Sequence, residues 1–210
     1  KWTYKEMTCD ETRTIITLRF TTDSPKLLLS SIWRARPGRG PIEHSVTIAN
    51  QTEGRITIAH QDSLTLMNLD TRESTSIWWI RRGGSNASEQ GGTFVEPVKA
   101  STNLTLVSKC DDGASPVPWM AVQRGEEGGL YAGWEFSGVG RLQATAREQG
   151  ARLEVAAGNL PDFKTDLMAG ETFYVPWAFF GCYSGDVDEG AYALHQWILR
   201  YLRPKLDPDI

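Results

Sequence analysis

Long apolar segments and an excess of basic charge are both missing from this sequence of 210 residues. No apolar run approaches the roughly 20 residues that a helix needs to cross a bilayer, so we expect no membrane partner. The chain has 22 basic and 26 acidic residues, a net charge of -4, and the two signs are interspersed. Without a basic stripe there is little to release counterions from phosphates, which argues against nucleic acid as a partner.

Cysteine is scarce, and metal-binding spacings are missing. The three cysteines, Cys9, Cys110 and Cys182, have no CxxC or Cys/His spacing, which argues against a zinc site and allows at most one disulfide. We expect all three to be small core residues. There is also no GxSxG, HExxH or P-loop, the motifs of nucleophilic hydrolases, zinc proteases and phosphate binding. The sequence therefore predicts no metal and no cofactor.

The first residues, KWTYKEMTCD, lack the apolar core and the cleavage site of a signal peptide. Because a signal could have been removed, a cytoplasmic and an exported location both stay open.

Short β-branched or aromatic runs, separated by turn residues, dominate the first 180 residues. Breaks such as PGRGP, DDGASP and GEEGG recur at a spacing typical of sandwiches and barrels. The runs outnumber the seven strands of a simple sandwich, and no linker or repeat divides them. We predict an all-β fold, a large two-sheet sandwich over residues 1–185. The expected strands are TRTIITLRF, KLLLSSIWRA, HSVTIAN, RITIAH, STSIWWIRR, NLTLVSK, PWMAVQR, LYAGWEF, ARLEVAA and ETFYVPWAFF.

One helix is predicted at the C-terminal end, over residues 186–203. Asp186, with Glu189 three residues on, resembles a capping box. Apolar residues then recur at helical spacing until Pro204 ends the helix. We expect this face to pack on the sandwich and to extend into a patch that meets another domain. Its members are Ala191, Leu194, Trp197, Ile198, Tyr201 and Leu202.

Two carboxylates are candidates for acid–base chemistry. Glu135 lies between Trp134 and Phe136, where neighbouring bulk can raise a carboxyl pKa. The same pattern is typical of a half-buried strand with the two aromatic residues on one face and Glu135 on the other. Glu43 precedes His44, and a His with a Glu can open a sugar ring, as in aldose epimerases. Neighbouring strand residues point to opposite faces, so these two do not form such a pair by themselves.

Tryptophan and arginine give the candidates for carbohydrate contact. Tryptophan is the commonest aromatic residue, with eight against seven Phe and six Tyr, and its ring can stack on a sugar or fill a core. Trp78 and Trp79 are consecutive in a predicted strand and must face opposite ways, so one needs a second covering surface. Trp33, Arg36 and Arg39 surround a Pro/Gly loop, which favours a sugar- or carboxylate-facing rim, although arginines that solvate a sheet edge give the same pattern.

The order of several segments resembles a known family. These segments are WRARPGRGPIEH, IWWIRRGGSNAS, PWMAV, GLYAGWEFSG, VAAGNLPDF and MAGETFYVPWAFFGCYSGDVDEGAYALHQWILRYLRP. Together they resemble the N-terminal domain of glycoside hydrolase family 36 and related melibiase-like α-galactosidases, most strongly over residues 115–205. GLYAGWEFSG and AGETFYVPWAFFGCYSGD are the most specific parts.

The resemblance implies a galactose mutarotase-like β-supersandwich, joined by its C-terminal helix to a catalytic (β/α)8 barrel outside these residues. In that family the two catalytic aspartates belong to the barrel, so the resemblance implies no catalytic residue in this chain. A loop of the domain can reach the barrel's sugar site, sometimes in a neighbouring subunit. The segment from Trp33 to Arg39 is the candidate for that loop, and a homo-oligomer follows as a possible partner.

Three functions stay open from the sequence. The leading one is a non-catalytic domain that braces the barrel of an α-galactosidase-like hydrolase and shapes its carbohydrate site. The second is a free-standing carbohydrate-binding module, and the third is a sandwich enzyme of the aldose epimerase type. The first predicts that the chain alone is no enzyme although its parent protein is one. For either sugar-binding reading, the contact candidates are Trp33, Arg36, Arg39, Trp78 and Trp79.

Overall fold

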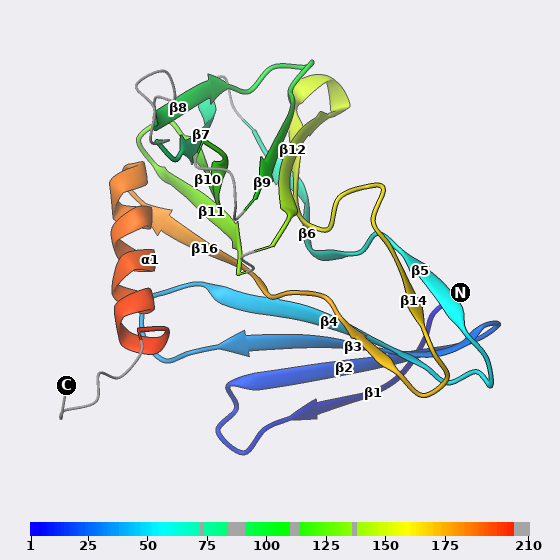
Figure 1. Cartoon of the computed structure of the whole chain (residues 1–210). Helices are drawn as coiled ribbons and strands as arrows, with labels where there is room; N and C mark the ends of the chain where they lie inside the picture. The colour runs from blue at the N-terminus through cyan, green and yellow to red at the C-terminus, as the bar shows by residue number, and fades with distance from the viewer. Residues whose placement is uncertain (72–73, 84–90, 110–113, 136–137, 204–210) are drawn as a thin grey trace.

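The computed structural model describes residues 1–71, 74–83, 91–109, 114–135 and 138–203. Within these residues the chain forms antiparallel sheets and a single α-helix, which confirms the predicted all-β sandwich with one C-terminal helix (Figure 1). The strands are β1 (Thr3–Cys9), β2 (Ile15–Asp23), β3 (Lys26–Ala35), β4 (Ile42–Asn50), β5 (Ile56–Ala59), β6 (Asp62–Asp70), β7 (Thr75–Arg81), β8 (Gly92–Pro97), β9 (Asn103–Ser108), β10 (Pro116–Arg124), β11 (Gly128–Trp134), β12 (Gly140–Arg147), β13 (Arg152–Gly158), β14 (Lys164–Leu167), β15 (Thr172–Tyr174) and β16 (Ala178–Ser184). The helices are the 3-10 turn η1 (Glu148–Gly150) and α1 (Val187–Tyr201).

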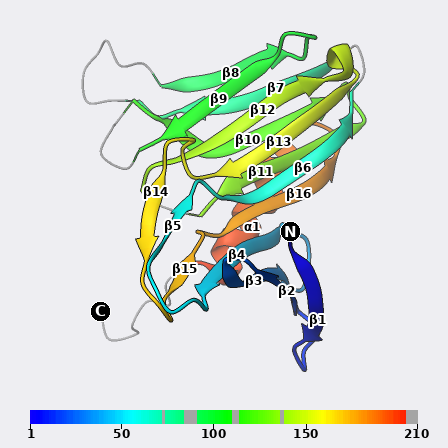
Figure 2. The same cartoon turned by 90° about the vertical axis from the view of Figure 1, so that its right-hand side faces the viewer.

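The strands form one large and two small sheets. The ten-stranded sheet runs in the order β1-β2-β3-β4-β16-β11-β10-β7-β8, with β15 also paired to β4. A four-stranded sheet has the order β6-β13-β12-β9, and β14 pairs with β5. Figure 2 shows the four-stranded sheet in front of the large sheet, with α1 behind it. The large sheet is therefore the middle layer of the domain.

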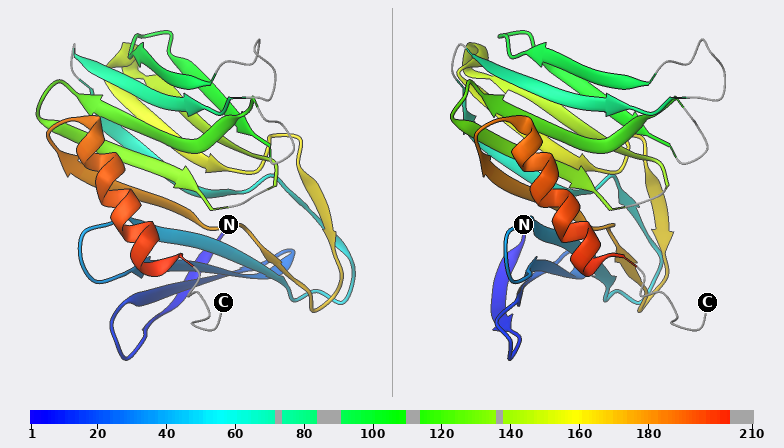
Figure 3. Two further views of the ribbon diagram at one scale, coloured as in Figure 1. Left: turned by 60° about the vertical axis from the view of Figure 1, so that its left-hand side comes forward. Right: turned by 90° about the vertical axis from the view of Figure 1, so that its left-hand side faces the viewer.

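Two apolar clusters hold these layers together. The first lies between the two larger sheets and includes the fully buried residues Ile77, Met120 and Leu153. The second lies between the outer face of the large sheet and α1, where Trp197 and Leu194 of the helix pack with Tyr131 of β11. Figure 3 shows α1 lying across this outer face. Burial on both faces explains why the central strands have few polar residues.

Burial decreases along the large sheet from β4 toward its edge at β1. One row of paired residues runs from Ile48 through Leu29 and Phe20 to Tyr4. Ile48 is 3 % exposed, the next two side chains are half-buried, and Tyr4 is 55 % exposed. The core face of β4 thus continues on β1–β3 past the cover of the four-stranded sheet, as Figure 2 shows.

Several strands differ from the sequence expectation. The sequence did not predict β1, β6, β8, β12 or β14, and the segment ETFYVPWAFF forms β15 and β16 rather than one strand. Pro176 lies in the break between them and has no N–H to donate to a neighbouring strand. The cysteine expectation was wrong for the described residues, because Cys9 and Cys182 are free and exposed. Cys110 lies outside the described residues.

The C-terminal helix begins as predicted. The Asp186 carboxylate accepts hydrogen bonds from the backbone N–H groups of Asp188 and Glu189, at 3.1 and 3.3 Å. The helix ends at Tyr201, and Pro204 lies outside the described residues. Its packing face differs from the prediction. Leu194 and Trp197 are buried and Tyr201 is partly buried, whereas Tyr192, Ile198, Leu199 and Leu202 are exposed.

Candidate functional site

The hairpin of β3 and β4 places a buried carboxylate against two arginines. In its register Arg34 lies opposite Glu43, on the outer face of the sheet. Glu43 is fully buried and accepts two hydrogen bonds from Arg34, including Nε to Oε2 at 2.8 Å. Arg36 donates from Nε to the same Oε2 at 2.8 Å. Because both oxygens of Glu43 are bound by guanidinium groups, this carboxylate is not free to take part in catalysis.

The loop after β3 packs on the C-terminal end of α1 (Figure 1). The Tyr201 hydroxyl donates to the carbonyl of Pro37 at 2.6 Å, and the Arg36 guanidinium lies 5.1 Å from the centre of the Tyr201 ring. A Cβ at Gly40 would overlap the Trp197 side chain, so only glycine lets this loop approach the helix so closely. The loop is thus fixed to the helix by hydrogen bonding, cation–π contact and close packing.

Glu135 lies beside these arginines, directly after β11. Its backbone N–H donates to the carbonyl of Trp177 at 2.7 Å, and the Arg34 guanidinium lies 4.2 Å from the centre of the Trp177 ring. Burial, with a smaller effect from the nearby charge of Glu43, raises the pKa of Glu135 to about 7. Arg34 and Arg36 oppose this shift. We call Arg34, Arg36, Glu43 and Glu135 the charged cluster.

The expectation that Glu135 belongs to a strand with Phe136 needs revision. β11 ends at Trp134, which packs in the core between the sheets, and Phe136 lies outside the described residues. The Glu135 carboxyl is half-buried, and its Oε1 has no hydrogen-bond partner among the described residues. Glu135 and Glu43 do not form the free pair of carboxyls that glycoside hydrolysis requires, because both oxygens of Glu43 are occupied.

His44 lies on the other face of the same strand, in the core. Its ring stacks on Trp33 at 4.0 Å, its Nδ1 contacts the carbonyl of Ser63, and its Nε2 lies 2.8 Å from Ser31 Oγ. Burial lowers the pKa of His44. A neutral ring that donates from Nδ1 and accepts at Nε2 satisfies these contacts. Glu43 and His44 therefore occupy opposite faces, and the acid–base pair of an epimerase does not form here.

The remaining candidates for carbohydrate contact are spread over the domain. Trp79 is 6 % exposed and stacks on Phe94 within the core cluster, which accounts for its ring. Trp78 lies on the outer face of the large sheet and lines a groove at the beginning of α1. Arg39 lines a cavity beside the last turns of α1. Arg36 joins the charged cluster, whereas Trp33 packs inside the sandwich.

We did not predict from the sequence that Glu43 belongs to the charged cluster or that Trp177 lies beside it. Glu43 was considered only with His44, and Trp177 was assigned to a continuous strand. A signal for the first was present, because Arg34 and Glu43 flank the Pro/Gly loop at positions that a hairpin places opposite each other. No local signal indicated that Glu135 and Trp177 would lie beside them.

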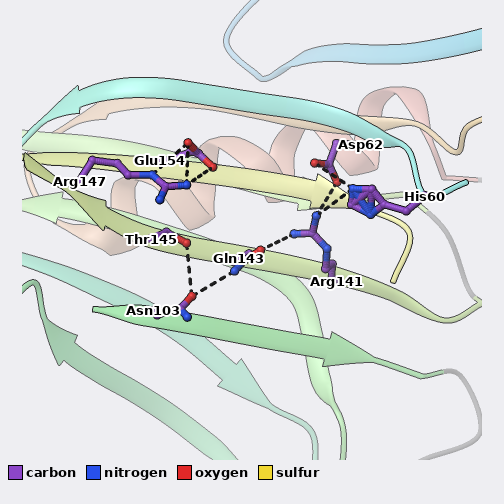
Figure 4. Close-up of polar contacts among 8 residues, drawn as sticks. All are labelled: His60, Asp62, Asn103, Arg141, Gln143, Thr145, Arg147 and Glu154. Carbon is purple, nitrogen blue, oxygen red and sulfur yellow. Dashed lines mark hydrogen bonds and ion pairs between the residues drawn. The ribbon is translucent and has the colours of Figure 1, made fainter. Parts of the chain in front are cut away.

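A second polar network covers the outer face of the four-stranded sheet, away from α1 (Figure 4). Arg141, only 5 % exposed, donates to Asp62 Oδ1 at 2.9 Å and to Gln143 Oε1 at 2.7 Å. Burial raises the pKa of Asp62, although Arg141 lowers it. His60, Asn103 and Thr145 extend this network, and Arg147 and Glu154 form a separate pair on the same face. These cross-strand pairs stabilise the sheet, so we do not take this network as the candidate site.

The described residues contain neither a metal-binding cluster nor a membrane-spanning helix. Among the described residues, no group of three or more His, Cys, Asp or Glu side chains is arranged to hold a metal ion. No helix in the described part of the chain has both the length and the apolar character to span a bilayer.

Comparison with known proteins gives matches only at the level of structure. No family model and no curated protein matches the sequence. The α-galactosidase from Lactobacillus brevis matches with a TM-score of 0.78 and 15% identity, covering 94% of this chain and 29% of that one. A variant of the family 36 α-galactosidase AgaA from Geobacillus stearothermophilus, in complex with 1-deoxygalactonojirimycin, matches with a TM-score of 0.74 and 16% identity, covering 93% of this chain and 30% of that one. A further variant of AgaA, in complex with stachyose, matches with a TM-score of 0.70 and 17% identity, covering 92% of this chain and 27% of that one.

These matches confirm, for the fold, the resemblance to glycoside hydrolase family 36 that the sequence segments indicated. The chain spans less than a third of the length of these solved structures. The rest of those proteins has no counterpart in the 210 residues.

Proposed function

We propose that this chain is the non-catalytic N-terminal β-sandwich domain of an α-galactosidase-like glycoside hydrolase, which braces a catalytic barrel and shapes its carbohydrate site. The observation that carries the proposal is the match of 94% of this chain to 29% of an α-galactosidase. A fold that recurs as one part of a larger hydrolase suits an accessory domain better than a complete enzyme. The barrel and a galactoside are thus the proposed partners.

An exposed apolar stripe on α1 supports docking of a barrel. Tyr192, Ile198 and Leu199 of α1 and Leu202 directly after it are each between 39 and 62 % exposed. At helical spacing Tyr192 and Leu199 lie opposite Trp197, and Ile198 and Leu202 flank them. Neighbouring apolar residues that face water usually mark an interaction surface. The occupant we propose is a barrel of the same polypeptide, because α1 is the last element of the described chain and would lead into it.

The charged cluster supports a role at the carbohydrate site. It lies beside the C-terminal end of α1, next to the loop of Arg36 and Arg39. A barrel that follows α1 would therefore meet this loop first. Half-buried guanidinium groups, and the Glu135 carboxyl in its protonated form, can donate hydrogen bonds to sugar hydroxyls or fix a loop that does so.

An activity assay tests the non-catalytic assignment. We expect the purified chain to fold and to leave aryl α-galactosides unhydrolysed, because the only carboxyl beside the buried Glu43 in the charged cluster is Glu135. Turnover that persists through purification and is lost in Glu135→Gln would contradict the proposal. The epimerase alternative predicts mutarotation of galactose that disappears in His44→Ala.

The parent reading frame tests the domain assignment directly. We expect it to encode several hundred residues of alternating strands and helices after Ile210. In that parent protein, Leu199→Asp should lower α-galactosidase activity, and Met67→Asp on the four-stranded sheet is the matched control, since Met67 is also exposed. Equal activity of both variants would remove the support for barrel docking on this stripe.

A further inference from the structure

One half-buried tryptophan has a ring that nothing in the described structure stacks upon. The Trp33 ring stacks on His44 and the Trp79 ring stacks on Phe94. The Arg34 guanidinium lies over the Trp177 ring. Trp78 has only its indole N–H satisfied, by Ser76 Oγ at 3.0 Å. This hydrogen bond fixes the ring. Trp78 packs against the apolar cluster beneath α1, but among the described residues no aromatic ring stacks on it and no cation lies over it.

The Trp78 ring lines a groove of 550 Å³ on the outer face of the large sheet. Gln123 and Glu126 line it from the end of β10 and the turn that follows, and residues 186–188 line it from the beginning of α1. The neighbour of Trp78 on β10 is Ala121, whose side chain is a single methyl group. The neighbour on β8 is Val95, which is 47 % exposed. The ring therefore lies in an open, partly apolar hollow.

Most polar groups of the groove are already used. Gln123 donates to the carbonyls of Gly125 and Gly185 at 2.7 and 2.9 Å, and its Oε1 accepts from the Tyr183 hydroxyl at 2.7 Å. The Asp186 carboxylate caps α1.

Two carboxylates of the groove are free. Those of Glu126 and Asp188 are exposed and make no hydrogen bond within the described residues. The groove thus offers a ligand one aromatic ring and two acceptors.

We propose that this groove binds a neutral pyranose, with its apolar face on the Trp78 ring and its hydroxyls donating to Glu126 and Asp188. A pyranose presents an apolar face and a rim of hydroxyl donors, which matches this set of groups. A cationic ligand also suits an aromatic ring with carboxylates. Asp188, however, lies in the first turn of α1, where the positive end of the helix dipole already offsets part of its charge. A neutral donor therefore fits better.

This site lies at the opposite end of α1 from the charged cluster and belongs to this chain alone. Sugar binding at this site does not need the barrel. A negative binding experiment would therefore contradict this site without contradicting the proposed function. Binding is measured on the 210-residue chain, whereas the proposed function is tested by the parent reading frame and its activity.

The experiment follows the indole N–H resonance of Trp78 by NMR while galactose, raffinose or stachyose is added. We expect a saturable shift with a dissociation constant of about 1–10 mM, because one ring and two acceptors give few contacts. Trp78→Ala should weaken binding at least tenfold, and Trp2→Ala, which removes an exposed tryptophan elsewhere, should leave it unchanged.

A second pair of variants covers the possibility that Trp78→Ala disturbs packing beneath α1. Glu126→Gln combined with Asp188→Asn changes only exposed side chains and should weaken binding severalfold. Asp162→Asn, at an exposed carboxylate elsewhere, is the control. The absence of a saturable shift with all three sugars, or a shift with choline but not with sugars, would overturn the proposal.

Discussion

Arg34 and Glu43 face each other across β3 and β4, with Arg34 Nε 2.8 Å from Glu43 Oε2 and the Glu43 side chain fully removed from water. Arg36 reaches the same oxygen from the loop that packs on α1. This one carboxylate thus joins the sheet, the loop and the helix. Removal of the Glu43 carboxylate should therefore destabilise the sheet, the loop and the helix together.

Glu43→Gln should destabilise the domain by about 2–4 kcal/mol, because two mostly buried guanidinium groups lose their counter-charge. The measurement is urea unfolding of both proteins. The control is Glu6→Gln, which breaks an ion pair with Arg19 whose side chains are about half exposed. That change should cost no more than about 1 kcal/mol. Equal effects of the two variants would mean that the buried pair has no special role.

Glu135 should make stability depend on pH. Its pKa is raised from 4.5 to about 7 in the folded chain, so the folded state binds more protons than the unfolded state between these values. Stability from this group is complete below about pH 4.5 and is lost as the pH rises through 7. Glu135→Gln should therefore gain stability over wild type between pH 4.5 and 8, as measured by urea midpoints. Parallel pH profiles of the two proteins would contradict this.

Glycine is required at Gly133 by the packing of an aromatic ring. A Cβ built there overlaps the Phe179 ring, whereas one built at Gly54 meets nothing within 4 Å. Gly133→Ala should therefore cost about 1–3 kcal/mol through overpacking. Gly54→Ala is the matched control and should leave the thermal midpoint nearly unchanged. If both variants have the same thermal midpoint, the close packing of Gly133 in β11 against Phe179 in β16 is wrong.

The exposed stripe of α1 should promote self-association of the isolated chain. Leu199→Asp or Leu202→Asp should reduce association in sedimentation experiments without loss of folding, since both side chains are 42 % exposed. Trp197→Ala should instead unfold or strongly destabilise the domain, by about 3–5 kcal/mol, because Trp197 is buried under the helix. A strictly monomeric wild-type chain at high concentration would leave the stripe without evidence of a binding role.

The sequence predicts what depends on local pattern. Alternation and turn residues predict the all-β class, Asp186 predicts the helix start, and the strand period predicts that Trp78 and Trp79 face opposite ways. It did not predict β1, because all seven residues of this edge strand are exposed and no apolar alternation marks it. Such an edge is defined only by its pairing with β2.

The packing of α1 and the charged cluster depend on contacts that the local pattern does not contain. The helical period allows Ile198 as well as Trp197 to face the core, and the direction in which α1 crosses the sheet selects Trp197. In the same way, Glu135 approaches Arg34 only because β16 pairs with both β4 and β11. The sequence contains both residues, but they lie far apart along the chain, so a local pattern could not predict their contact.

The pairing of β4 with β16 also governs the order in which the domain can be completed. His44 lies opposite Ala178 of β16 and Ile48 lies opposite Phe173 of β15, so the strands β1–β4 are made first but gain these neighbours only when residues 172–184 exist. Until then the apolar row from Ile48 to Tyr4 does not continue to Phe173. Such distant pairings raise the contact order and slow folding. During synthesis the N-terminal strands are therefore the part of the nascent chain most exposed to aggregation and most in need of a chaperone.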